Sequence, residues 1–246
     1  MHRIRVPLQH LWLFPFISGT AWFVTLAVLL ITWFAKGMPK YPLQSNPYVA
    51  FISDIGAFTL KPFFLTGASI TGITYIATVI LVHFARYDHR VYGIADVRWK
   101  KALSIFAMVC GIIAGLGLVL LGILDTARYR LAHQWLLLAC LLGIVGSAVS
   151  TTVVYWDQVW KPSPFRNLRF YATISAATVL ADFALGVAMY GFMRAKHWRI
   201  AGILEWSMAF VGAFYILAFV GFVSVPEEGI DEREREALLR REEGEE

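Results

Sequence analysis

Charged residues are scarce in this chain, and cysteines are scarcer still. Asp, Glu, Lys and Arg make up 16% of the 246 residues, whereas a soluble domain carries about 25%. So few charges cannot cover a water-facing surface, which excludes an ordinary soluble domain. Cys110 and Cys140 both fall within apolar runs, so they do not form the disulfide framework of a small secreted protein.

Signatures of the common enzyme classes are missing as well. The chain contains no serine nucleophile elbow, Walker loop, glycine-rich dinucleotide fingerprint or His-Glu-x-x-His pair. This favours a protein that is not an enzyme, and we expect no cofactor and no metal ion. The basic residues are scattered over short loops, which excludes a nucleic-acid-binding face.

Long apolar runs are abundant. Hydrophobic residues make up 58% of the chain, and six runs are long enough to cross a hydrocarbon layer of roughly 30 Å. We therefore predict an all-α, polytopic membrane protein with six transmembrane helices in one bundle. The predicted spans are residues 11–34, 62–84, 102–124, 134–156, 168–193 and 200–223.

The charge distribution divides the chain into an amino-terminal tail (1–10), a membrane domain (11–225) and an acidic, mobile tail (226–246). Residues 227–246 hold ten acids and four arginines, a net charge of −6, so the overall +5 leaves +11 for the rest. Segments on the side of the amino terminus hold fourteen basic residues, against eight on the other side. This bias predicts that both termini are cytoplasmic.

The segment between the second and third predicted spans is rich in basic residues. Anionic lipid headgroups of the cytoplasmic leaflet attract such segments. We expect its basic side chains to contact these headgroups or a peripheral partner. They are Arg86, Arg90, Arg98, Lys100 and Lys101.

Four ionisable residues fall at the opposite, outer end in this topology: Asp54, Asp125, His133 and Glu205. A carboxylate about one turn inside a span is costly unless it has a partner. Such a set could bind a headgroup, hold a cation or serve as acid and base in a lipid-remodelling reaction. The alternative is a polar clasp that pins the long loop of residues 35–61 to the helix ends.

Asp182 lies near the centre of the fifth predicted span. An isolated charge there is expensive, so we expect this group to be protonated, hydrogen-bonded or turned toward a wet cavity. Two interpretations stay open: a lipid or proton translocator that uses Asp182, and a single structural hydrogen bond to another span.

Three short motifs resemble those of the FRAG/DRAM/Sfk family of six-span membrane proteins. The segment 52–57, Ile-Ser-Asp-Ile-Gly-Ala, precedes a proline-led span. Leu124-Asp125 is followed by His133 at the start of the fourth span, and Glu205-Trp206 lies early in the sixth. The resemblance covers roughly residues 10–225 and is nearest to the Sfk and autophagy-modulator (DRAM) branches.

This resemblance implies an integral protein of the plasma membrane or, second, of endolysosomal membranes. Sfk-like members are associated with the recruitment of phosphatidylinositol 4-kinase and with plasma-membrane lipid distribution. We therefore expect a non-enzymatic protein that organises membrane lipids or recruits a peripheral partner, with a role in phosphoinositide kinase regulation or in membrane lipid homeostasis. Its expected partners are anionic headgroups and a peripheral kinase complex.

Overall fold

Helices alone make up the regular structure of the described part of this chain, residues 10–88, 91–160 and 166–224 of a computed structural model. Six of these segments are long and apolar enough to cross a membrane, with α7 and α8 together forming the last. The predicted all-α, six-span class is confirmed. The helices are α1 (Leu13–Ala35), α2 (Ile52–Gly56), α3 (Lys61–Tyr87), α4 (Arg98–Ile123), α5 (Arg130–Trp160), α6 (Arg166–Arg194), α7 (Trp198–Ala218) and α8 (Val220–Val223).

The helices extend beyond the apolar runs that predicted them. Pro62 lies in the first turn of α3, where a missing backbone N–H is tolerated. α5 has 31 residues and is therefore about 46 Å long. It exceeds the hydrocarbon thickness, so both of its ends reach the headgroup layers.

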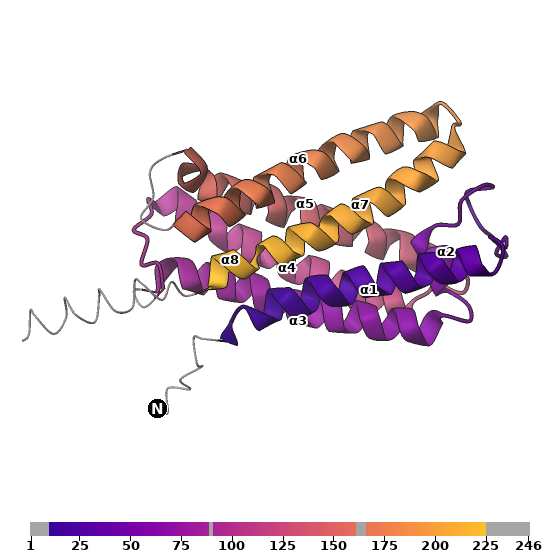
Figure 1. Cartoon of the computed structure of the whole chain (residues 1–246), viewed down its shortest axis with the longest axis horizontal. Coiled ribbons are helices and arrows are strands. Elements are labelled where there is room, and N and C mark those ends of the chain that lie inside the picture. Colours follow the sequence, from indigo (N-terminus) through magenta and orange to yellow (C-terminus); the bar gives the residue numbers. More distant parts are fainter. Residues whose placement is uncertain (1–9, 89–90, 161–165, 225–246) are drawn as a thin grey trace, which may run out of the picture.

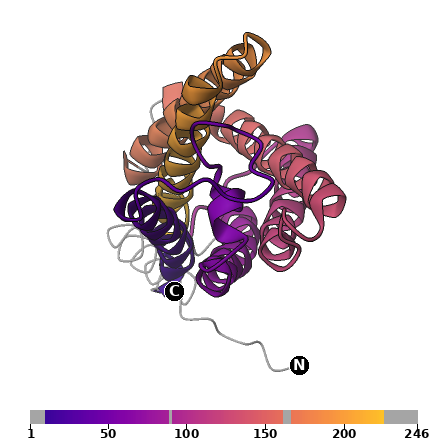
Figure 2. The same cartoon turned by 90° about the vertical axis from the view of Figure 1, so that its right-hand side faces the viewer.

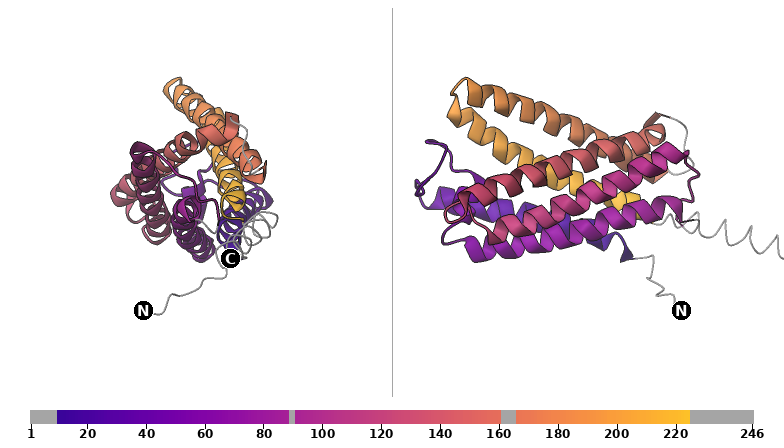
Figure 3. Two further views of the ribbon diagram at one scale, coloured as in Figure 1. Left: turned by 90° about the vertical axis from the view of Figure 1, so that its left-hand side faces the viewer. Right: turned by 180° about the vertical axis from the view of Figure 1, so that it is seen from behind.

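The six long helices form a ring in the order α1, α3, α4, α5, α6, α7 and back to α1 (Figures 1 and 2). One end of the ring carries residues 36–60 and the short turns 124–129 and 195–197, and we name it the loop end. The other carries the start of α1, segment 91–97 and α8, and we name it the terminal end. At the loop end the α6–α7 hairpin leans away from the other helices (Figures 1 and 3).

Glycines allow α3 and α4 to approach closely. A Cβ added at Gly72 would lie 2.5 Å from the Gly115 carbonyl oxygen, closer than two such atoms can come. The small-residue step from Gly111 to Gly115 therefore lies in a helix–helix contact.

Candidate functional site

Asp54 holds the short helix α2 together. Its carboxylate accepts a hydrogen bond of 3.0 Å from the Phe51 amide, just before the helix begins. Asp54 is buried, and this burial raises the pKa of its carboxyl group. The Phe51 hydrogen bond and the nearby positive charge of Arg130 offset only part of the rise. The carboxylate thus satisfies a backbone donor that the helix start would otherwise leave unpaired.

The long loop before α2 is tied to α7 by buried side chains. The Trp206 indole donates to the Ala50 carbonyl oxygen at 3.0 Å. Asn46, fully buried, donates to the Trp198 carbonyl at 2.6 Å and accepts hydrogen bonds from the amides of Tyr48 and Val49. This apolar loop therefore folds back onto the bundle, and Figure 2 shows it crossing the end of the ring.

The same contacts bring Glu205 to α2. Its carboxylate lies against the Ile52 amide and within electrostatic range of Asp54. One carboxylate oxygen, Oε2, is buried and accepts no hydrogen bond from any residue the structure describes. Two carboxylates 151 positions apart in sequence therefore lie near each other at the loop end.

Asp125 closes the turn between α4 and α5. Its carboxylate contacts Lys61 Nζ at 2.5 Å and accepts from the Arg128 and Ala127 amides at 2.8 and 3.1 Å. Burial alone would raise the pKa of Asp125. The hydrogen bonds from Lys61 and the Arg128 amide, with the charges of both side chains, outweigh burial and lower it.

His133 is held at the same turn, where its Nδ1 lies 2.7 Å from the Leu124 carbonyl oxygen. The ring is buried and within electrostatic range of Asp125. A nitrogen that binds a backbone carbonyl in this way is the donor, so the proton lies on Nδ1.

The structure thus brings all four predicted residues to the loop end, where they form two groups. Asp54 and Glu205 meet beneath the loop, while Asp125 and His133 share the α4–α5 turn. Asp54, Asp125 and His133 make hydrogen bonds of good geometry with backbone groups, and Glu205 lies against the Ile52 amide, as a clasp requires. A catalytic role for the set stays a prediction. Nowhere in residues 10–88, 91–160 and 166–224 do three His, Cys, Asp or Glu side chains gather in a way that could hold a metal ion.

Asp182 lies halfway along α6 and is half-buried. Its Oδ1 atom is buried and has no hydrogen-bond partner among the described residues. The predicted structural hydrogen bond to another span is therefore not present at this oxygen. A role in translocation stays a prediction.

A buried ion pair occupies the terminal end. Arg86 is 1% exposed, and its guanidinium makes two hydrogen bonds to Asp96, at 2.6 and 2.9 Å. It also donates to the Val154 carbonyl at 3.1 Å and lies over the Tyr155 ring, 4.4 Å from its centroid. Arg86 was expected to contact lipid headgroups, but its burial leaves it unavailable to them. Instead it fixes segment 91–97 to the bundle.

The other basic residues that were predicted to contact headgroups differ in their exposure and in their partners. Arg98 and Lys101 are exposed at the start of α4, with Trp99 (56% exposed) between them. Lys100 is mostly buried and pairs with Asp157 at 2.5 Å. Arg90 lies outside the described residues, as do residues 226–246 of the predicted tail.

Asn46 and Asp96 were not singled out from the sequence. Asn46 precedes a proline, a pair that favours turn initiation, so a signal for a turn was present. Asp96 lies ten residues after its partner Arg86 in a segment without regular structure, and no sequence spacing marks such a pair.

Fold and polar contacts together define a six-span integral membrane protein with a structured loop over one end. The family described as "Frag1/DRAM/Sfk1/Cwh43P N-terminal domain" matches residues 10–221. The chain belongs to this family, as the three motifs predicted.

Two yeast proteins are similar over much of the chain. Protein sfk1 of Schizosaccharomyces pombe is 26% identical over 204 residues, 83% of this chain and 61% of that protein. Protein SFK1 of Saccharomyces cerevisiae is 28% identical over 160 residues, 54% of this chain and 45% of that protein. The chain therefore spans less than two thirds of the length of these relatives. No solved structure matches it.

Proposed function

We propose that the protein is a non-enzymatic organiser of membrane lipids that binds anionic phospholipid headgroups at its terminal end. One observation carries this proposal: Arg98 and Lys101 are exposed beside Trp99 at the first turn of α4. Tryptophan at a helix end favours the headgroup layer. Each basic side chain near an anionic surface contributes about 1 kcal/mol.

The terminal end holds the backbone that carries these side chains in place. Segment 91–97 is fixed by the Arg86–Asp96 pair and by the Tyr92 hydroxyl, which donates to the Gly221 carbonyl at 2.8 Å. Lys100 anchors the first turn of α4 to Asp157 on α5. Binding therefore has little backbone left to order at this end, and a low entropic cost of ordering favours affinity.

The loop end supports a structural role better than a catalytic one. Asp54, Asp125 and His133 each form a hydrogen bond with a backbone amide or carbonyl group at a helix end or turn. A lipid-remodelling reaction needs acid and base groups that can reach a substrate. Side chains committed to backbone caps are poorly placed for that task.

The expected partner follows from the resemblance to Sfk-like proteins. A peripheral phosphatidylinositol 4-kinase would meet the protein at the same terminal end, where its lipid substrate also lies. Plasma membrane is the proposed location, because its cytoplasmic leaflet is rich in anionic lipids.

Lipid retention tests the proposal. Purified protein would be equilibrated with phosphatidylinositol 4-phosphate or phosphatidylcholine in detergent, and bound lipid counted by native mass spectrometry. Replacing Arg98 and Lys101 by Gln removes about 2 kcal/mol of attraction, so phosphoinositide retention should fall by roughly thirtyfold. Phosphatidylcholine retention should not change.

The matched control replaces Lys36 and Lys40, which are exposed at the loop end. This variant loses the same charge but should keep its bound phosphoinositide. Equal retention by both double variants would refute a specific site at the terminal end.

A further inference from the structure

One face of α5 changes from exposed to buried along its length. Its residues recur at intervals of four and three positions, which places them on the same side of the helix. They are Leu137, Leu141, Ile144, Ala148, Thr151 and Tyr155. The first three are between 38% and 45% exposed, whereas the last three are between 3% and 6% exposed. Other elements therefore cover this face only in the half of α5 toward the terminal end.

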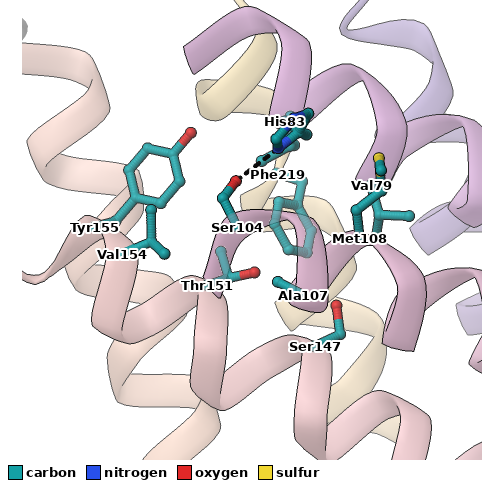
Figure 4. A pocket seen from close by; sticks show the side chains of 11 residues that line it. Val79, His83, Ser104, Ala107, Met108, Ser147, Thr151, Val154, Tyr155 and Phe219 are labelled. Atoms are coloured by element: carbon teal, nitrogen blue, oxygen red, sulfur yellow. Dashed lines mark hydrogen bonds between the residues drawn. The ribbon is translucent and has the colours of Figure 1, made fainter. Parts of the chain in front are cut away.

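The covered half of this face belongs to the core of the bundle. Thr151 and Tyr155 line a small pocket together with Ser104 of α4 and Phe219 at the end of α7 (Figure 4). Tyr155 also packs edge-on against Phe222 of α8, with the ring centroids 4.6 Å apart. The uncovered half begins beyond these contacts and continues to the loop end.

α6, the neighbour of α5 in the ring, shows the same change. Ala172 and Tyr190 are 18 residues apart, which is about five helical turns, so they lie on one line along the helix. Ala172 is 3% exposed and belongs to the same core cluster as Tyr155, whereas Tyr190 is 66% exposed. Phe183, about 20° from that line, is 69% exposed. The face of α6 that joins the core near the terminal end is therefore accessible near the loop end.

The lean of the α6–α7 hairpin accounts for both changes. α6 contacts α5 near the terminal end and diverges from it toward the loop end (Figures 1 and 3). The two exposed apolar faces are thus the walls of an open cleft. From Arg130 to Ile144, α5 is about 21 Å long, whereas the hydrocarbon of one leaflet is about 15 Å thick. The cleft therefore runs through the leaflet at the loop end.

An arginine lies at the mouth of each wall. Arg130 is the first residue of α5 and lies seven positions before Leu137, on the same face. Arg194 is the last residue of α6 and follows Tyr190 by four positions. Both are exposed, and neither forms a salt bridge with a residue that the structure describes. Long basic side chains at the end of a span place their charge in the headgroup layer.

We propose that this cleft binds one phospholipid of the leaflet at the loop end. One acyl chain lies between α5 and α6, and the phosphate lies between Arg130 and Arg194. A guanidinium group binds a phosphate through two parallel hydrogen bonds, so the mouth suits the phosphate as the walls suit the chain. A second copy of this chain would bring its own two arginines to the same place, and the like charges oppose that occupant. The site lies in the opposite leaflet from the headgroup site proposed at the terminal end.

Lipid titration tests the role of the two arginines. The full chain in detergent would be titrated with dioleoyl phosphatidylcholine or with dioleoylglycerol, which lacks the phosphate, and bound lipid counted by native mass spectrometry. The wild type should retain one phosphatidylcholine per chain and bind dioleoylglycerol more weakly. Arg130→Gln combined with Arg194→Gln should weaken phosphatidylcholine binding by roughly thirtyfold.

The matched control for charge is the Lys36→Gln, Lys40→Gln variant, which loses two exposed positive charges at the same end of the molecule. It should bind phosphatidylcholine as the wild type does. Equal losses in the two double variants would overturn the assignment of the phosphate to the arginines.

Filling the cleft gives a readout that does not depend on charge. Leu141→Trp adds a large ring to the cleft wall and should abolish phosphatidylcholine retention. Leu142→Trp adds the same ring about 100° further around the helix, at a position that is 62% exposed, and should leave retention unchanged. Both positions are exposed, so both variants should melt close to the wild type.

Two results of this comparison would overturn the proposal. The first is equal phosphatidylcholine retention by the two tryptophan variants. The second is a wild-type dimer that Leu141→Trp alone dissociates, because a second copy of the chain would then occupy the cleft.

Discussion

The Arg86–Asp96 pair is the clearest case in which a single contact governs local structure. Removing one partner of a buried ion pair leaves an uncompensated charge and costs about 3–5 kcal/mol. We therefore predict that Arg86→Met strongly lowers the free energy of unfolding, whereas exposed Arg98→Met changes it by less than about 0.5 kcal/mol. Denaturation of the two purified variants in detergent measures the difference.

A double variant separates loss of the pair from loss of packing. Arg86→Met combined with Asp96→Leu removes both charges, so no lone charge stays buried. It should recover much of the stability lost in Arg86→Met alone. No recovery in the double variant would contradict the ion-pair explanation.

Asp125 should make stability depend on pH. Its pKa is lowered in the folded protein, so its contribution is complete above the ordinary carboxyl pKa of 3.8. The contribution is lost as the pH falls through the lower, folded pKa. The melting temperature of Asp125→Asn should therefore be lower than that of the wild type at neutral pH, and the difference between the two melting temperatures should disappear in acid.

Asp54 should affect the pH dependence of stability in the opposite direction, because burial raises the pKa of its carboxyl group. Protonation of Asp54 then favours the folded state, and this stabilisation grows as the pH falls toward 3.8.

Melting curves of the wild type and of Asp125→Asn, from neutral to acid pH, separate the contribution of Asp125 from that of Asp54, which both proteins share. A wild-type-to-variant gap that persists in acid would contradict the role given to Asp125.

At the scale of elements, the close contact between the loop and α7 is the most sensitive feature. A Cβ added at Gly202 would lie 2.7 Å from Asn46 Nδ2 and from Val49 Cβ. Gly202→Ala should therefore destabilise the protein and expose the loop to protease. Gly212, on the same helix, has open space around it, so Gly212→Ala should stabilise by about 0.5–1 kcal/mol.

Limited proteolysis of the loop and thermal melting would compare these two variants. The comparison is internal, since both changes add one methyl group to α7 and raise its helix propensity equally. Equal behaviour of the two variants would show that the loop does not pack on α7 as described.

The lengths of the apolar runs predicted the six spans, because a helix that crosses hydrocarbon needs a long run of apolar side chains. These lengths did not predict where each helix ends. α5 continues from Arg130 to Trp160, because backbone hydrogen bonding persists into the headgroup layer after the apolar run has stopped. α2 has only five residues, and it depends on a cap and on packing against α1 and α3. Neither feature is visible in local sequence periodicity.

At the scale of the whole molecule, the number and direction of the spans decide which parts of the candidate site could be predicted. Spans of alternating direction bring Asp54, Asp125, His133 and Glu205 to one end, so their shared location followed from the span count. Their division into two groups depends on where helices lie in the ring. The burial of Arg86 depends on the path of segment 91–97. Neither the ring order nor this path follows from a count of spans.

The orientation of the ring in the membrane decides whether the basic terminal end can meet anionic lipid. A single cysteine at position 48 or 101 would be introduced after replacing Cys110 and Cys140 by Ala, and intact cells treated with a membrane-impermeant maleimide. Tyr48→Cys should be labelled at once, and Lys101→Cys only after permeabilisation. Labelling of Lys101→Cys in intact cells, with Tyr48→Cys protected, would place the basic residues on the outer face and contradict the proposed function.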